Sequence, residues 1–194
     1  VGLIPEPMFY DLVGWEKQFK TLYEYEQSDE YPVEEILNVA KAASLGEEEK
    51  TADYLQYMKN ANPVIRYWGA YGIYLAGLSS SLIYRELKEM ANHDAIAANR
   101  IMAAQAFGIC GDPKQTFEIL MHEAKETNRG YVLLQALNAI QFSETDDQLT
   151  LQDWKTLQNK KFNTTKGTDQ TGIAMAQRII SDAIEIWPER RKVK

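Results

Sequence analysis

The residues of this chain that could take part in covalent or metal chemistry are few and widely spaced. The two histidines, His93 and His122, lie 29 positions apart, and neither belongs to a metal-binding spacing such as H-E-x-x-H. The single cysteine, Cys110, leaves no internal disulfide, and its apolar context GICGD favours a small buried side chain. We therefore predict no catalytic residue, no metal site and no bound cofactor.

Three short motifs resemble functional signatures but lack the parts that would make them work. The segment GLSSSL, around Ser80, lacks the G-x-S-x-G pattern of a nucleophile turn, and a helix-capping loop is the better interpretation. GICGDPK has two glycines but no G-K-[ST] end for phosphate, which favours a tight turn. Asn163 begins a glycosylation sequon, a pattern too common to carry an argument.

Arginines and aromatic residues are the better candidates for contacts. Arg66 and Arg100 are single charges in otherwise apolar segments, and a buried arginine requires partners, which predicts structural residues at a seam between repeats. The alternative, a ligand-binding role, would need solvent access. Candidate interaction residues are Tyr67, Tyr71, Tyr74, Trp15 and Tyr23. The first three share one helical spacing, so they could pack in a core or interface or form a platform for a sugar ring.

The segment NPVIRYWGAYGIYLAG, residues 62–77, predicts an interior helix. Asn62 is a good N-cap, and Pro63 suits the first helical position. Its residues are apolar nearly all round, so other elements must cover most of its sides. Gly69 and Gly72 fall on one face, where they allow a neighbouring element to approach closely.

The same pattern returns after 34 residues. Arg66 and Arg100 are each followed by small residues three and six positions on, and by a glycine eleven positions on, Gly77 and Gly111. A fainter version surrounds Leu37, with a glycine at Gly46. Self-similarity at a period in the thirties indicates a stacked repeat.

We therefore expect an all-α protein, a right-handed α-α superhelix (a HEAT-like solenoid) of about four to five helix pairs. Each pair joins a mostly uncharged helix to the amphipathic helix that follows it. The expected pairs are 32–44 with 47–58, 62–77 with 80–91, 95–109 with 112–124, and 130–142 with 151–157, and a final helix at 172–187 closes the array. Its apolar stripe would be Gly172, Ala176, Ile179, Ala183 and Ile186.

Composition and charge indicate how the ends of the chain are organised and which partners are not expected. Residues 1–31 form an aromatic and acidic lead-in, with a short helix near residues 15–23, that packs on the repeat domain 32–187; residues 188–194 form a basic tail. Residues 1–60 carry thirteen acidic and five basic side chains, and the chain has no basic stripe, so nucleic acid is not an expected partner. No apolar run is long enough to span a membrane. The start, with neither methionine nor signal-type segment, suggests a mature or excised fragment.

Several segments of the sequence resemble segments of known protein families. NPVIRYWGAYGIYLAG, ANRIMAAQAFGICG and VLLQALNAI are similar to HEAT-like repeats. Together with GLIPEPMF and YPVEEILNVAKAAS, they resemble the region that follows the catalytic domain in a group of bacterial formylglycine-dependent sulfatases. The resemblance covers most of residues 2–142. A tetratricopeptide pattern fits Trp68, Tyr71 and Gly72 but fails at later positions.

The resemblance implies a parent protein that hydrolyses sulfate esters, is exported or periplasmic, and uses calcium and a modified cysteine or serine. None of these residues transfers here, since Cys110 to Lys114 fits neither the proline nor the arginine of the C/S-x-P/A-x-R motif. This chain would be a non-catalytic accessory domain packing against the catalytic domain of the same parent chain, or against a protein partner. Alternatives are a sulfated-glycan binding module, an interaction solenoid of the tetratricopeptide type, and a self-sufficient enzyme.

Overall fold

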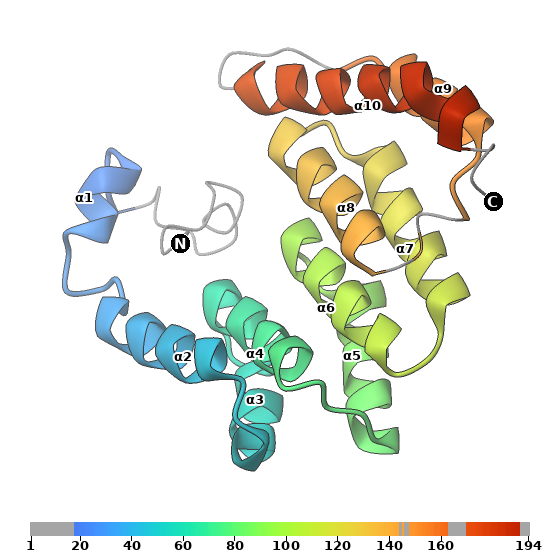
Figure 1. Ribbon diagram of the computed structural model, residues 1–194. Helices are drawn as coiled ribbons and strands as arrows, with labels where there is room; N and C mark the ends of the chain where they lie inside the picture. Colours follow the sequence, from blue (N-terminus) through green and yellow to red (C-terminus); the bar gives the residue numbers. More distant parts are fainter. Residues whose placement is uncertain (1–17, 144, 146–147, 163–169, 191–194) are drawn as a thin grey trace. The chain divides into compact units, whose positions relative to one another are not determined.

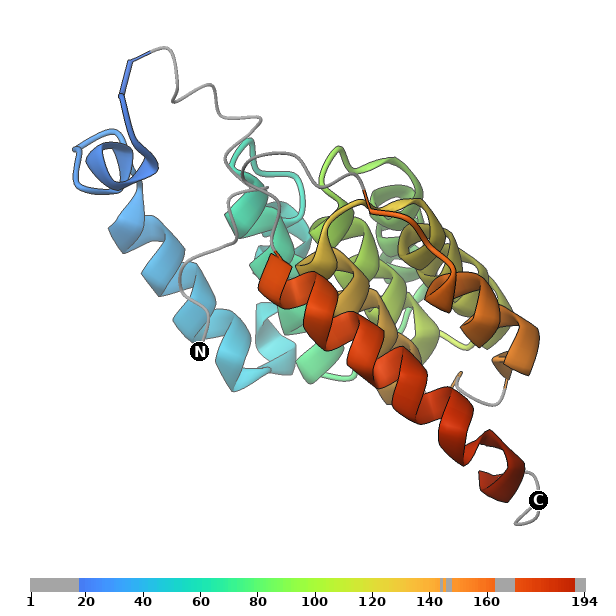
Figure 2. The ribbon, with the colours of Figure 1, turned by 90° about the horizontal axis from the view of Figure 1, so that it is seen from above.

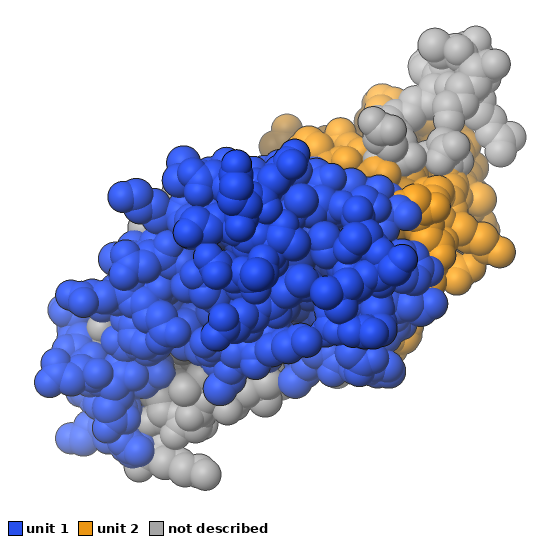
Figure 3. All heavy atoms as spheres, turned by 90° about the horizontal axis from the view of Figure 1, so that it is seen from below, with its two compact units in different colours: residues 1–110 blue, residues 111–194 orange. Residues whose placement is uncertain are grey.

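The described part of the chain is entirely helical. The computed structural model describes residues 18–143, 145, 148–162 and 170–190, and within these ranges it contains helices and no strand. The predicted all-α class is therefore confirmed. The chain divides into two compact units, residues 1–110 and residues 111–194 (Figure 3).

The first unit contains six α-helices and one short 3-10 helix among its described residues (Figure 1). Their bounds are α1 Leu22–Glu26, α2 Val33–Leu45, η3 Glu48–Lys50, α3 Thr51–Tyr57, α4 Pro63–Leu75, α5 Ser81–His93 and α6 Ala97–Ile109. The helix expected near residues 15–23 is not found there: residues 18–21 are not helical, and the short helix α1 begins only at Leu22, where the Thr21 side chain caps it by accepting from the Glu24 N–H. Residues 15–17, including Trp15, lie outside the described residues.

Helices α2, α4 and α6 pack side by side, and α3 and α5 pack against α4 and α6 respectively (Figures 1 and 2). The central helix α4 is interior, as predicted: eight of its residues are buried, and Trp68 is only 7% exposed. Asn62 caps it by accepting a hydrogen bond from the Val64 N–H at 2.9 Å, with Pro63 in the first turn.

The predicted close approach at the glycine face of α4 is also confirmed. A methyl group added at Gly69 would lie 2.7 Å from the Met58 backbone nitrogen, and one added at Gly72 would lie 2.7 Å from the Tyr54 ring. Tyr54 is fully buried, and its hydroxyl donates to the Ala42 carbonyl and accepts from the Glu47 N–H, both at 3.1 Å. One phenol thus ties the end of α2, the start of η3 and the glycine face of α4 together.

The corners before α4, α6 and α8 have the same local structure. In each, a polar side chain accepts a hydrogen bond from the backbone N–H two residues on: Asn60 from Asn62, Asp94 from Ile96, and Thr127 from Arg129. Such turns hold the backbone extended just ahead of a helix. Because these corners recur 34 and then 33 residues apart, the sequence period has a counterpart in backbone geometry.

The second unit contains α7 Pro113–Glu126, α8 Gly130–Phe142, α9 Leu151–Gln158 and α10 Gln170–Arg190 (Figure 1). Helix α8 packs against α7 and α10, and α9 also contacts α10. Asp112 caps α7 by accepting from the Gln115 N–H at 3.1 Å, as expected. Thr150 and Asp153 form a reciprocal capping box at the start of α9, and the Lys125 ammonium pairs with Asp153 at 3.3 Å, which ties α9 to α7.

The pairing of consecutive helices differs from the prediction. Within the two units, the expected pairs joined α2 to α3, α4 to α5 and α8 to α9, whereas the closely packed consecutive pairs are α3 with α4, α5 with α6, α7 with α8, and α9 with α10. The short polar corners fold each helix back along its predecessor. The glycines Gly46 and Gly77 instead adopt left-handed backbone angles and turn the next helix away, and Gly111 also has a positive φ. The observed pairs are therefore shifted by one helix from the expected pairs.

The buried stripe of α10 also differs from the prediction. Ile173, Ala176 and Ile180 are buried, whereas Ile179 and Ile186 are 39% and 43% exposed. The first turn of α10 lies directly against Gly130 of α8, where a side chain would collide with Gly172 and Ile173. This contact fixes the rotation of α10 about its axis, which a count of apolar positions does not reveal.

Candidate functional site

Arg66, the single charged residue of α4, makes several hydrogen bonds within the fold. Its Nε and Nη2 donate to the two carboxylate oxygens of Asp94 at 2.7 and 3.1 Å. Its Nη1 donates to the carbonyl oxygens of Asn60 and Ala61, both at 3.0 Å. The side chains of Arg66 and Asp94 are only 17% and 4% exposed. The positive charge of Arg66 is therefore balanced by the Asp94 carboxylate within the fold.

Arg100 occupies the equivalent place at the start of α6, 34 residues later. Its Nη1 donates to the Asp94 carbonyl at 2.8 Å, six residues before it, as Arg66 does to Asn60. The fully buried Asn99 side chain donates to the Pro63 carbonyl at 3.1 Å and to the Asp94 carboxylate at 3.2 Å. The two arginines thus lie at the corners where neighbouring helix pairs meet. These contacts describe a structural seam between α4 and α6.

Tyr67, Tyr71 and Tyr74, which were predicted as interaction residues, form a continuous row along α4. The Tyr67 and Tyr71 rings are nearly parallel, with centroids 6.4 Å apart, and Tyr71 and Tyr74 are 6.3 Å apart. All three are partly buried, and burial raises the pKa of Tyr67 to about 12. Tyr71 also meets Trp68 edge to face at 5.4 Å. The row is therefore anchored on the core by Trp68.

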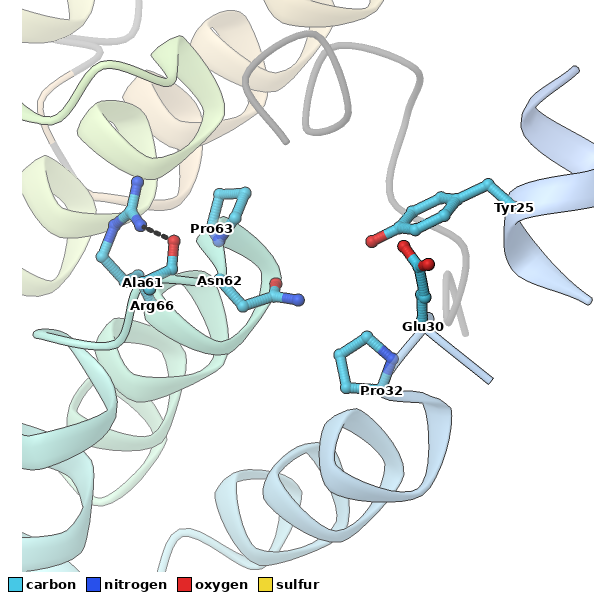
Figure 4. A pocket seen from close by; sticks show the side chains of 7 residues that line it. All are labelled: Tyr25, Glu30, Pro32, Ala61, Asn62, Pro63 and Arg66. Atoms are coloured by element: carbon cyan, nitrogen blue, oxygen red, sulfur yellow. Dashed lines mark hydrogen bonds between the residues drawn. The ribbon is translucent and has the colours of Figure 1, made fainter. Parts of the chain in front are cut away.

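A hollow of about 310 Å³ lies between the connection from α1 to α2 and the start of α4 (Figure 4). Its lining residues are Tyr25, Glu30, Pro32, Ala61, Asn62, Pro63 and Arg66. In Figure 4 the Tyr25 hydroxyl and the Glu30 carboxylate lie close together on one wall, and the first turn of α4 forms the other. Its volume is at the lower end of the range of small-molecule sites, enough for one side chain or a similarly small molecule.

Four helices of equal length each end on an exposed apolar side chain. Helices α2, α4, α6 and α8 are each 13 residues long, and their last residues are Leu45, Leu75, Ile109 and Phe142. These are 62%, 42%, 40% and 65% exposed. In the first unit, Gly46 at the end of α2 lies against Leu75 at the end of α4. The starts of α4 and α6 are in contact through the Asn99 side chain and the Pro63 carbonyl, and the two helices are equally long and side by side, so their ends lie at the same edge. We call Leu45, Leu75 and Ile109 the apolar edge.

The reactive groups are not brought together. His93 and His122 are exposed and lie on different helices, α5 and α7, and the nearest acid to His93 is Glu89 at 3.9 Å. Burial raises the pKa of the Cys110 thiol, and a hydrogen bond from the Ser79 hydroxyl offsets part of that rise. Ser80 caps α5 by accepting from the Ile83 N–H, as predicted. Within the described residues, no group of three or more His, Cys, Asp or Glu side chains could hold a metal ion.

Tyr23 and Trp15 are the two remaining residues that were predicted to form an interaction surface. Tyr23 lies on α1 and is 70% exposed, whereas Trp15 lies outside the described residues. Among the described helices, none combines the length and apolar character that crossing a bilayer requires. Comparison with protein-family models, with curated proteins and with solved structures finds no match to this chain.

Sequence reasoning missed Asp94, Tyr25 and Glu30 as members of these groups. Asp94 could have been found, because it repeats Asn60 at the 34-residue period and lies between the two arginines. Tyr25 and Glu30 give no such signal. They approach Pro63 and Arg66 only through the path of the connection between α1 and α2 (Figure 4).

Proposed function

We propose that this chain is a non-catalytic accessory domain of a sulfatase-type protein and packs against the catalytic domain of that parent. The observation that carries the proposal is the apolar edge of Leu45, Leu75 and Ile109. Exposed apolar side chains gathered at one edge are typical of surfaces that are covered by a partner. The sulfatase assignment itself comes from the sequence resemblance, which also suggests an exported bacterial parent.

The repeated corners and arginine contacts suit this role. They support, as part of the proposal, a HEAT-like stack with a right-handed superhelical path. A stack of this kind is held by contacts between neighbours and presents extended surfaces to other proteins. The exposed Tyr23 on α1 offers a second contact for the catalytic domain, as the lead-in was expected to do.

Whether the parent protein is a sulfatase can be tested from its coding sequence and from its hydrolysis of sulfate esters. The residues encoded upstream of Val1 should contain a C/S-x-P/A-x-R motif. This chain alone should not hydrolyse a chromogenic sulfate ester, and the parent chain should. Turnover by this chain alone would end the accessory proposal and favour a self-sufficient enzyme.

The docking edge can be tested with separately expressed parts. The Leu75→Asp and Ile109→Asp variants should bind the catalytic domain of the parent at least about tenfold more weakly in calorimetric titration, because each puts a charge into an apolar contact. Leu82→Asp is the matched control, since Leu82 is 47% exposed on α5 and lies outside the apolar edge. Equal losses for all three variants would contradict docking through this edge.

Glycan binding is the second candidate, and it depends on the tyrosine row. The parallel Tyr67 and Tyr71 rings and the partly exposed Tyr74 would be its platform. Saturable binding of a sulfated glycan that is lost in Tyr71→Ala, with an unchanged circular dichroism spectrum, would favour it over docking.

A further inference from the structure

We propose that the hollow beside α4 receives a lysine side chain of the protein that docks on this chain, which we name the lysine hollow. This inference rests on the proposed role as an interaction domain and specifies the chemistry of the partner. The two walls of the hollow, shown in Figure 4, differ in charge.

The wall formed by α4 offers little to an anion. Arg66 already gives Nε, Nη1 and Nη2 to Asp94 and to two backbone carbonyls. Pro63 has no N–H, and the Val64 N–H is taken by the Asn62 side chain. A helix start usually attracts anions through its N–H groups and dipole, but here Pro63 lacks this donor, and the Val64 N–H and the Arg66 cation already have partners.

The opposite wall favours a cation. Glu30 is exposed, and its negative charge is one reason why the pKa of Tyr25 is raised, after burial and Tyr31. Oriented with its nitrogen toward Glu30, the Gln18 amide donates to both carboxylate oxygens at 2.9 and 2.8 Å, which positions the carboxylate without neutralising it. The Tyr25 ring is held between Phe19 and Tyr31, with centroids at 5.4 and 5.5 Å.

Shape and surroundings select a long aliphatic cation. The Pro32 and Pro63 rings line opposite sides, so a methylene chain can lie between them while its ammonium group reaches the carboxylate and the phenol oxygen. Lysine has such a stem with a compact charged tip. Residues 18–60 add a wider attraction, because they carry ten acidic and four basic side chains.

A titration followed by nuclear magnetic resonance tests the hollow directly. The probe is N-acetyl-lysine methylamide, with N-acetyl-norleucine methylamide as the uncharged analogue. We expect saturable shifts of the Glu30, Ala61 and Asn62 amides with lysine, at a dissociation constant on the order of millimolar for one side chain. Norleucine should bind at least about fivefold more weakly. Equal binding of both probes, or no saturable shift with lysine, would overturn the inference.

Matched variants separate a local site from general acidity. Glu30→Gln should weaken lysine binding about tenfold, while Glu48→Gln, which removes the same charge from an exposed position outside the hollow, should leave it nearly unchanged. Similar effects of both would show that overall charge attracts the probe and that the hollow does not. Circular dichroism of both variants checks that the helices remain.

The same variants distinguish this inference from the proposed function. If the catalytic domain binds the wild-type chain and Glu30→Gln equally well, the lysine hollow is wrong and the docking proposal stands. If no catalytic domain binds while the lysine probe still does, the docking proposal fails instead.

Discussion

The Arg66 guanidinium donates two hydrogen bonds, of 2.7 and 3.1 Å, to the carboxylate of Asp94, which lies 28 residues later in the chain. The same carboxylate accepts the Ile96 N–H at 2.8 Å, the bond that shapes the corner before α6. One acidic side chain therefore fixes both a local turn and the contact between neighbouring helix pairs. A planar guanidinium is suited to such two-point contact.

Replacing Asp94 should be among the most damaging polar substitutions in the first unit. Asp94→Asn keeps an oxygen for the Ile96 N–H but leaves the Arg66 charge without its carboxylate. We expect a loss of about 3 to 5 kcal/mol in the free energy of unfolding, as for other buried pairs that lose one partner. Urea denaturation followed by circular dichroism measures it.

The control is an exposed ion pair in the same unit. Lys50 and Asp53 lie 3.5 Å apart, with each side chain 46% exposed, so Asp53→Asn should cost less than about 1 kcal/mol. If Asp94→Asn and Asp53→Asn destabilise the protein equally, the seam does not depend on the Arg66 contact.

Tyr67 should titrate later than an ordinary tyrosine. Its folded-state pKa is about 12 against the usual 10.0, because burial favours the neutral phenol. The stabilisation that follows from this shift is fully present below pH 10 and is lost as the pH rises from 10 to 12. Burial also raises the pKa values of Tyr25 and Tyr54, so ultraviolet absorbance of tyrosinate in the folded protein should show a late phase to which Tyr67 contributes, and Tyr67→Phe should make this phase smaller.

The unfolded protein supplies the comparison for that titration. In urea the burial of Tyr67 is lost, so the late phase should move to lower pH. A late phase of unchanged amplitude in folded Tyr67→Phe would show that Tyr67 does not contribute to it.

Cys110 should react slowly with thiol reagents at neutral pH. Burial raises the pKa of its thiol, and the thiolate is the reactive form. Ser79→Ala removes the hydrogen bond that offsets part of this rise in pKa, so labelling of the variant should be about threefold slower than that of the wild-type protein. Both proteins should label equally fast in urea. Faster labelling of folded Ser79→Ala would contradict the assigned contact.

Helix positions could be predicted from the sequence because their signals are local. Asn62 with Pro63 and Asp112 with Pro113 mark the starts of α4 and α7, and the structure places both caps as expected. The closing glycines Gly46, Gly77 and Gly111 all take left-handed angles, at φ values of 59°, 61° and 94°. In each case the neighbouring residues alone carry the information.

The pairing of helices and the hollow could not be predicted in this way. Whether α4 packs on α3 or on α5 depends on which corner folds back, and both connections are short and polar or glycine-containing. The lysine hollow joins residues 25–32 to residues 61–66, which share no motif or spacing. Such features depend on the path of the chain between elements, for which one sequence gives no periodic signal.

The close approach of α3 to α4 can be tested by filling it. Gly72→Ala places a methyl carbon 2.7 Å from the Cδ1 and Cε1 atoms of Tyr54, a fully buried ring whose hydroxyl is held at Ala42 and Glu47. Overpacking of this kind costs about 1 to 3 kcal/mol, of which the better helix propensity of alanine returns up to about 1 kcal/mol. We expect a net loss of unfolding free energy, measured by urea denaturation.

A second background separates the collision from backbone effects. In Tyr54→Leu the ring is gone, so adding Gly72→Ala should be neutral or stabilising, which gives a coupling of at least about 1 kcal/mol in a double-mutant cycle. Gly77→Ala is the matched control, because no atom lies within 4 Å of the added methyl group and its cost comes from the positive φ of 61°. That cost should be the same in both backgrounds. If Gly72→Ala is equally harmful without the Tyr54 ring, the ring does not set the distance between α3 and α4.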